Sequence, residues 1–302
     1  MAARRTRNWL ALAAALATAS PALAGQQPLT RLFTPGAEEH YRVTVAFKAE
    51  TRTVATEAVA EQTYVTPVVH VAEVSLGWRS VRRVLAVHGD GSAETEEAIS
   101  PLATACEGAR QPEGRSDAKL QESLAAVCSA LLKAAVLRGV EGPNGLLRES
   151  ARDLPCDLGE AAPQLLALWL RRAVRPSVIF PALPFAAGAK AERPLHPAGE
   201  LLRNARGSES TEWLEAGEEA PSASLHVVQH LSWEGAPEVP ARQEEFFADS
   251  LTTVSLLDGG VLRARRSASR AWSHRTEPVP GLPAPPEFSS KLTVSVVLER
   301  LP

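Results

Sequence analysis

Three segments of this 302-residue chain alternate apolar and polar side chains with a period of two residues. The clearest runs are 41–48, 225–233 and 292–298. This alternation is typical of β-strands that bury one face and expose the other. Half-buried strands of this kind belong mainly to antiparallel sheets, so the pattern predicts a chain built mostly on antiparallel β-structure.

Two turn motifs join further extended runs. Gly89-Asp90-Gly91 separates 80–88 from 92–99, and Asp258-Gly259-Gly260 separates 246–257 from 261–272. An Asp-Gly pair between strands is a strong signal for a two-residue hairpin, in which both central residues need positive φ. We therefore expect an antiparallel meander in each outer third of the chain, with separate strands at 51–60 and 65–78 in the first.

The middle of the chain has a different pattern. Ser116 can cap a helix with apolar positions at helical spacing, and residues 160–174 form a second helical pattern. Pro143-Asn144-Gly145 lies between these segments and could instead turn a hairpin between short strands. Prolines then indicate an irregular crossing segment, at positions 181, 184, 194 and 197.

These patterns together predict an α+β fold that is mostly antiparallel β. We expect a curved sheet, or two β lobes, with a two-helix insert in the middle of the chain. The expected divisions are a cleaved signal peptide (1–24), an N-terminal β meander (25–100), a loop and helical insert (101–180) and a C-terminal β portion (181–302). The two β portions are expected to pack as one unit.

The N-terminal segment has the pattern of a secretory signal. Arg4, Arg5 and Arg7 precede a short apolar run, and Ala22-Leu23-Ala24 gives the small-x-small pattern before Gly25. Removing this segment changes the formal charge from −3 to −6, so no basic surface indicates nucleic acid as a partner. No apolar stretch reaches the roughly 18–20 residues that cross a bilayer, so we expect an exported protein of the periplasm or the exterior without a transmembrane span.

Export changes the interpretation of the three cysteines. An oxidising compartment allows disulfides, and an odd count leaves one thiol over. Cys106 and Cys156 lie in loop-like surroundings, whereas Cys128 lies in an apolar helical run. We expect a Cys106–Cys156 disulfide and a buried free Cys128, although spacing alone does not determine the pairing. A catalytic cysteine is the alternative, but no histidine lies near any of the three in the chain.

No motif in the sequence assigns catalytic residues, a metal site or a cofactor. His226 and His230 share one face of a predicted strand, about 13 Å apart by the rise per residue, which is too far to share a metal ion. Glutamates cluster at 94–97, 215–219 and 244–245, where adjoining turns and small residues favour solvated rims.

Arginines crowd one arm of the second predicted hairpin: Arg263, Arg265, Arg266 and Arg270. On a strand, the first two point one way and the last two the other. One interpretation is a site for an anionic partner such as a lipopolysaccharide or a phospholipid headgroup. The other, which we favour, is an edge strand that charge protects against pairing with a neighbouring sheet.

One part of the sequence resembles exported bacterial β-rich proteins of unknown function. The residues concerned are Phe180-Pro181-Ala182-Leu183-Pro184, followed by Gly188, and Gly281-Leu282-Pro283 before the last strand. Those proteins place a Leu-Pro … Gly … Trp segment between two β-rich halves. Here no tryptophan follows the glycine closely, and Trp213 is the next one along the chain. The resemblance implies an envelope location and a β-rich fold and supplies no active site.

The sequence therefore favours an exported, non-enzymatic protein of the bacterial envelope or exterior. Its predicted role is a binding scaffold for an apolar or amphipathic ligand, such as a lipid, or for a partner protein of the envelope. A first alternative is an envelope assembly or structural factor that uses its sheet edges. A second alternative is a hydrolase whose site has no recognised motif.

Overall fold

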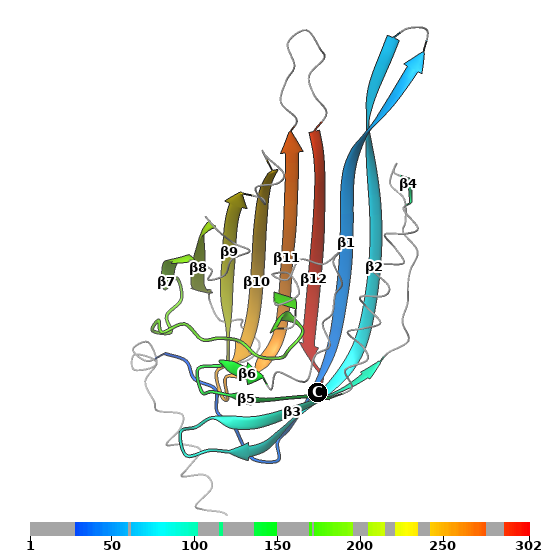
Figure 1. Cartoon of the computed structure of the whole chain (residues 1–302). Helices are drawn as coiled ribbons and strands as arrows, with labels where there is room; N and C mark the ends of the chain where they lie inside the picture. The colour runs from blue at the N-terminus through cyan, green and yellow to red at the C-terminus, as the bar shows by residue number, and fades with distance from the viewer. Residues whose placement is uncertain are drawn as a thin grey trace, which may run out of the picture.

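The computed structural model describes residues 28–59, 62–101, 115–116, 136–149, 169–170, 172–195, 205–214, 221–234, 242–275 and 287–302. Their strands form one open 12-stranded sheet in the order β6-β5-β3-β2-β1-β12-β11-β10-β9-β8-β7, with β4 off this path beside β2 (Figure 1). The β2–β4 pair is parallel, and the pairs along the main path are antiparallel. The predicted antiparallel β-structure is thus confirmed, as a single sheet.

The strand bounds are as follows: β1 (Glu38–Val59), β2 (Gln62–Val87), β3 (Ala93–Pro101), β4 (Arg115–Ser116), β5 (Val136–Glu141), β6 (Leu147–Glu149), β7 (Lys190–Leu195), β8 (Arg206–Leu214), β9 (Ser222–Glu234), β10 (Arg242–Ser255), β11 (Val261–Arg275) and β12 (Glu287–Arg300). The first and last long strands, β1 and β12, pair with each other in the centre of the sheet. The end of the chain is therefore held inside the sheet, as the alternation at 292–298 predicts.

Strands β1 and β2 are longer than predicted. They pair with each other over all of β1, from Glu38 opposite Arg83 to Val59 opposite Gln62, and β12 accompanies β1 only as far as Arg52. Beyond this point β1 and β2 continue as a two-stranded ribbon (Figure 1). The separate strands predicted at 51–60 and 65–78 are therefore wrong, since each continues a longer strand. Pro67 does not interrupt β2, because on the ribbon β2 has a described partner on one side only.

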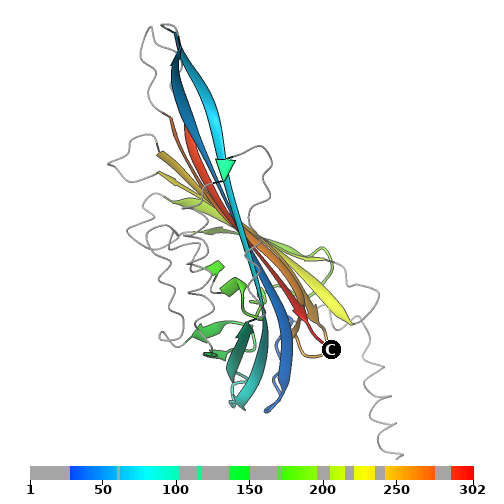
Figure 2. The same cartoon turned by 90° about the vertical axis from the view of Figure 1, so that its right-hand side faces the viewer.

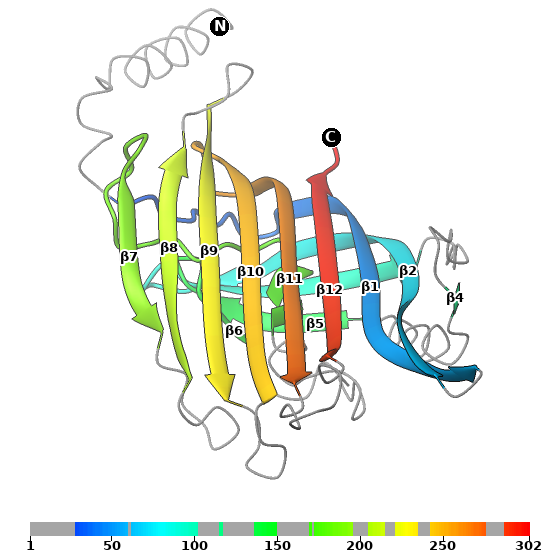
Figure 3. The same cartoon turned by 90° about the horizontal axis from the view of Figure 1, so that it is seen from above.

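The sheet curls strongly at one end. Strands β3, β5 and β6 lie across that end at a steep angle to the wall formed by β7 to β12, β1 and β2 (Figures 1 and 3). A register shift between Val84 and Ala86 marks the place where β2 and β3 bend. Figure 2 shows the accompanying twist of the wall. We call this folded-over region the closed end of the sheet.

The core lies on the inner, concave face of the sheet. Along each strand alternate residues point into it, and the buried apolar side chains on β1 are Tyr41, Val43, Val45, Phe47 and Ala49. Residues 172–189, which we call the covering segment, pack against this face. Phe185 meets the ring of Trp213 edge-on at 5.2 Å, and Phe180 stacks on it at 6.4 Å. These contacts fix one layer of the core over β8.

The turns follow the predicted chemistry but are longer. Five residues separate β2 from β3 and β10 from β11, and of the four glycines in the two motifs Gly91 and Gly259 have positive φ. The aspartate closes each turn, because Asp90 Oδ1 accepts from the Ser92 N–H at 2.9 Å and Asp258 Oδ1 accepts from the Gly260 N–H at 2.9 Å. The prediction of two-residue hairpins is therefore wrong, although both hairpins exist.

The hairpin at 143–145 forms between β5 and β6. Gly145 has φ +75°, and a Cβ added there would lie 1.7 Å from the Val178 carbonyl oxygen, so only glycine fits. The N-terminal segment ties this turn to the β10–β11 turn: the Arg31 N–H donates to the Pro143 carbonyl, and the Leu32 N–H to the Asp258 carbonyl.

The two-helix insert falls largely outside the described residues. Only a last helical turn near 169–173 is described, in which the Val174 N–H donates to the Leu170 carbonyl at 3.1 Å. The signal segment, all three cysteines and 281–283 also lie outside the described residues. Strands β7 and β8 have no counterpart in the sequence prediction, where prolines indicated an irregular crossing.

Candidate functional site

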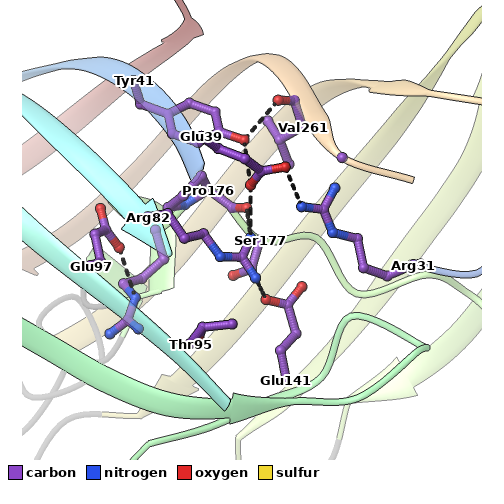
Figure 4. Close-up of polar contacts among 12 residues, drawn as sticks. Arg31, Glu39, Tyr41, Arg82, Thr95, Glu97, Glu141, Pro176, Ser177 and Val261 are labelled. Atoms are coloured by element: carbon purple, nitrogen blue, oxygen red, sulfur yellow. Dashed lines mark hydrogen bonds and ion pairs between the residues drawn. The ribbon is translucent and has the colours of Figure 1, made fainter. Parts of the chain in front are cut away.

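The closed end of the sheet holds a charged cluster of Arg31, Glu39, Arg82, Glu97, Glu141 and Arg175 (Figure 4). None of the six residues is more than 6% exposed. They come from the N-terminal segment, β1, β2, β3, β5 and the covering segment, so the cluster joins the curled strands to the wall of the sheet.

Arg82 lies at the centre of the charged cluster. Its guanidinium pairs with Glu141, lies 3.6 Å from Glu39 Oε2 and donates to the Pro176 carbonyl at 2.9 Å. Arg82 and Glu39 face each other in the β1–β2 register, whereas Glu141 comes from β5. A single side chain therefore connects two layers of the sheet and the covering segment.

Glu39 is surrounded by cations. Arg31 Nη2 donates to Glu39 Oε1 at 2.5 Å, and Arg300 Nη2 lies 3.5 Å from the same oxygen. Burial raises the pKa of Glu39, but the guanidinium groups of Arg31, Arg82 and Arg300 outweigh burial and hold this pKa below its usual value. The Tyr41 hydroxyl lies 3.2 Å from Glu39 Oε2 and 3.1 Å from the Val261 carbonyl oxygen, so its proton can serve either acceptor.

Glu97 and Glu141 differ from Glu39. Arg175 Nε lies 3.1 Å from Glu97 Oε2, and Arg82 pairs with Glu141. Burial is nevertheless the larger influence at both carboxyl groups, and it raises their pKa values above the usual range. One cluster thus contains carboxyl groups whose pKa values are shifted in opposite directions.

The charged cluster is unsuited to general acid–base catalysis. Its three carboxyl groups each have an arginine partner, and each is at most 6% exposed. A substrate would have to displace an arginine and open the packed closed end to reach them. Within the described ranges, no group of three or more His, Cys, Asp or Glu side chains has the geometry of a metal site.

Arg266 has a different role from the other predicted arginines. Its guanidinium donates to four carbonyl groups of the covering segment, at Arg172 (3.3 Å), Ala173 (2.9 Å), Arg175 (2.9 Å) and Ser177 (2.7 Å). It thereby caps the C-terminal end of the helical turn, where unpaired carbonyl groups favour a cation. Burial lowers the pKa of Arg266 to about 10, so it is still charged at neutral pH.

The predicted arginine patch is divided between two faces, as strand alternation predicts. Arg263 and Arg265 are exposed on the outer face. Arg266 and Arg270 point inward, where Arg270 pairs with Glu244 and lies over the Trp233 ring at 5.7 Å. The edge-protection interpretation is wrong, because β11 lies between β10 and β12 in the interior of the sheet. Arginine on the inner face instead satisfies buried acceptors.

His226 and His230 lie on the outer face of β9, opposite Leu251 and Phe247 of β10. His226 Nε2 is 2.9 Å from Asp249 Oδ1, and both side chains are partly exposed. The expected polar-face arrangement of the two histidines is present.

The inner face beyond the charged cluster is apolar across seven adjacent strands, from β2 to β8 along the sheet. Its buried side chains include Val74, Leu76, Trp78, Val294, Val296, Leu298, Ala264, Ala268, Phe246, Ala248, Leu225, Leu231, Trp233 and Trp213. Trp213 also exchanges backbone hydrogen bonds with the covering segment, because its carbonyl accepts from Gly188 at 2.7 Å and its N–H donates to Ala189 at 3.0 Å. The covering segment is therefore fixed to this face by backbone and side chains.

The sequence predictions missed the charged cluster, and the solvated rim expected at 94–97 is wrong for Glu97, which is 2% exposed. A local signal exists for Glu39, which has the same parity as Tyr41 and Val43 on an apolar strand face. A charged residue at such a position must be paired when it is buried. No local signal identifies its partners. Arg31 lies eight residues earlier, outside the strand, and Arg82 is brought opposite Glu39 by the β1–β2 register.

No family model matches the chain, and no curated protein matches it. In the part of the chain that the structure describes, no helix has the length and apolar character needed to cross a membrane.

Proposed function

We propose that this protein is an exported, non-enzymatic binding scaffold that holds an apolar or amphipathic ligand, or an apolar segment of a partner, on the inner face of its sheet. The observation that carries the proposal is the continuous apolar surface that seven strands present to the concave side. Binding would bury apolar ligand surface against Leu, Val, Phe and Trp side chains.

The attachment of the covering segment supports this proposal. Its polar anchors are at its two ends: Arg82 and Arg266 bind carbonyl groups of residues 172–177, and the backbone of Gly188 and Ala189 bonds to Trp213. Between these ends, the rings of Phe180 and Phe185 contact the ring of Trp213 on the inner face. Apolar contacts of this kind can be exchanged for contacts with a ligand without leaving buried polar groups unpaired.

The sheet edge favours a scaffold over an assembly factor that adds partner strands. Strand β7 forms one edge of the sheet and carries exposed Lys190, Glu192, Arg193 and Pro194. Charged side chains and proline are typical devices that prevent edge-to-edge pairing. The sealed carboxyl groups of the charged cluster likewise disfavour a hydrolase.

Native mass spectrometry tests the proposal. The full chain, expressed with its own N-terminal segment and purified without detergent, is expected to carry an additional lipid-like mass that organic extraction removes. The extracted protein should then bind cis-parinaric acid, and Leu231→Gln on the inner face should weaken this binding severalfold. His230→Gln, the outward-facing neighbour, is the matched control and should bind normally.

A clean apo mass in several preparations, together with no parinaric acid binding by folded protein, would contradict the proposal. Equal binding by the Leu231→Gln and His230→Gln variants would place the ligand elsewhere. Far-UV circular dichroism of both variants separates lost binding from lost folding.

A further inference from the structure

The outer face of the sheet has a hollow of about 380 Å³ at the end opposite the charged cluster. It is lined by Glu50, Arg52, Val69, Glu245, Ala271, Trp272, Ser273, Ser289, Ser290 and Lys291, from β1, β2, β10, β11 and β12. Its volume falls in the range of roughly 300–1,000 Å³ that small-molecule sites occupy. No sequence motif pointed to it, because its residues come from five strands.

The register explains why the surface is hollowed here. Ser289 lies opposite Arg52 on one side and Ser273 on the other. In the next row, Ala271 lies between Lys291 and Glu245. Three small side chains therefore form the floor, and longer charged side chains surround it.

The charges around the hollow are unequally paired. Glu50 is 2.8 Å from Lys48, an exposed lysine beside the hollow. Within the described residues, Arg52, Lys291 and Glu245 have no ion-pair partner. On the β1–β12 side the hollow therefore offers two cations, and the Glu50 carboxylate faces Lys291 across these two strands. On the β10 side it offers one available carboxylate.

From this arrangement we propose that the hollow binds a small zwitterionic phosphoester, a molecule with a phosphate group and a primary amine. The phosphate would lie between Arg52 and Lys291, with the hydroxyl groups of Ser289 and Ser273 as further donors. Four donor groups match a tetrahedral phosphate better than a carboxylate, whose two oxygens one arginine can satisfy.

Glu245 supplies the second half of the recognition. Glu245 and Lys291 lie on β10 and β12, with β11 between them. The spacing of neighbouring strands therefore separates their backbones by about 10 Å. Long side chains reaching in from both sides leave room for the few bonds that separate phosphate from ammonium in such a molecule. Ala271, which lies between Lys291 and Glu245 in the register, offers a small apolar surface for the carbon atoms between the two groups.

Titration of the full chain with phosphoethanolamine, followed by calorimetry and ³¹P NMR, tests the proposal. Arg52→Gln and Lys291→Gln should each weaken binding about tenfold, since each removes a charge-assisted contact. Arg42→Gln and Arg79→Gln are matched controls, because both arginines are exposed on β1 and β2 away from the hollow. The controls should bind within about twofold of the unmodified chain.

Phosphocholine and inorganic phosphate test the role of Glu245. Phosphocholine has a cation without N–H donors, and phosphate has no cation, so both should bind several times more weakly than phosphoethanolamine. Glu245→Gln should abolish this preference and leave inorganic phosphate binding unchanged. No preference among the three probes in the unmodified chain would overturn the zwitterion assignment.

The two sources of such a group are separated by vesicles. Binding of free phosphoethanolamine and of phosphatidylethanolamine vesicles would assign a lipid headgroup, and binding of the free compound alone would assign a soluble phosphoester. No binding up to about 20 mM, or unchanged binding by folded Arg52→Gln protein, would overturn the proposal. These outcomes do not depend on the inner face, where the proposed scaffold function is tested.

Discussion

Strands β1 and β2 carry charged side chains at both ends, and the two ends of the sheet use them in opposite ways. At the closed end, Glu39 and Arg82 face each other on the inner side and are at most 6% exposed. Near the ribbon, Lys48 and Glu73 face each other on the outer side, 3.7 Å apart, and are nearly half exposed. Each pair joins a glutamate to a basic residue, so the parity of each position and the curl of the sheet determine whether the pair is buried or exposed.

This comparison distinguishes charges that the fold depends on from charges that a ligand can use. A buried ion pair has lost its water, so removing one partner leaves an uncompensated charge. An exposed charge keeps its water and contributes little to stability. The charged cluster is accordingly structural, whereas Arg52 and Lys291 are available at the outer hollow.

The largest expected effect is that of Arg82→Met. The substitution removes the partner of Glu141 and one partner of Glu39, and it frees the Pro176 carbonyl. We expect the free energy of unfolding to fall by about 3–5 kcal/mol in urea titrations. Arg52→Met, on the adjacent strand but outward, should change it by no more than about 0.5 kcal/mol.

A double variant sharpens this test. Arg82→Met with Glu141→Leu replaces the pair by apolar side chains and should recover part of the lost stability. Glu39 keeps Arg31 and Arg300 in this background. If Arg82→Met and Arg52→Met lowered the free energy of unfolding by similar amounts, burial would not explain the different roles of the charges at the two ends of the sheet.

The second largest effect is expected for Arg266→Met. Four carbonyl groups of the covering segment lose their donor, so we expect a loss of about 2–3 kcal/mol and faster proteolysis within residues 172–189. Arg265→Met is the control, because Arg265 is the exposed neighbour on the outer face. An unchanged cleavage rate in Arg266→Met would mean that the guanidinium does not hold the segment.

Local sequence signals predicted the faces of the strands but not their order. Alternation at 41–48 and 292–298 identifies the buried side chains of β1 and β12, yet nothing in either segment indicates that they pair with each other. That pairing depends on contacts between the two ends of the chain, which no local pattern encodes. The same limit applies to the hairpins: Asp-Gly located the turns, while the side chain of the aspartate determined their length.

The candidate sites were hidden for a related reason. Arg266 and Arg265 are adjacent in the sequence, and only the position of β11 inside the sheet gives them opposite environments. Arg31 reaches Glu39 because the N-terminal segment crosses the turns at Pro143 and Asp258. The outer hollow depends on the register of five strands, so no single segment carries its signature.

A smaller effect is expected from two glycines with similar backbones. Gly259 and Gly188 have φ of +68° and +79°, so alanine at either should cost about 1 kcal/mol from the left-handed conformation. A Cβ at Gly259 would also lie 2.6 Å from the Thr30 carbonyl oxygen, whereas a Cβ at Gly188 would meet open space. Gly259→Ala should therefore cost about 1 kcal/mol more than Gly188→Ala in thermal unfolding. Equal losses would argue that the N-terminal segment does not brace the closed end.

The smallest expected effect is a change in how the free energy of unfolding depends on pH. It distinguishes Glu39 from Glu141 within the charged cluster. The pKa of Glu39 is lowered in the fold, so its stabilising contribution is present above the usual value of 4.5 and is lost as the pH falls through the folded pKa. The pKa of Glu141 is raised, so its contribution is fully present below 4.5 and is lost as the pH rises through the folded pKa.

Two substitutions should therefore alter different parts of the same curve. Glu39→Gln should make the unfolding free energy less sensitive to pH below 4.5, and Glu141→Gln should make it less sensitive above 4.5. Urea midpoints measured from pH 3 to 8 report both slopes, and each variant serves as the control for the other. If both variants flattened the same pH range, the arginines would have to influence the two carboxyl groups equally. That result would contradict the arrangement in which Glu39 has three cationic neighbours and burial is the larger influence at Glu141.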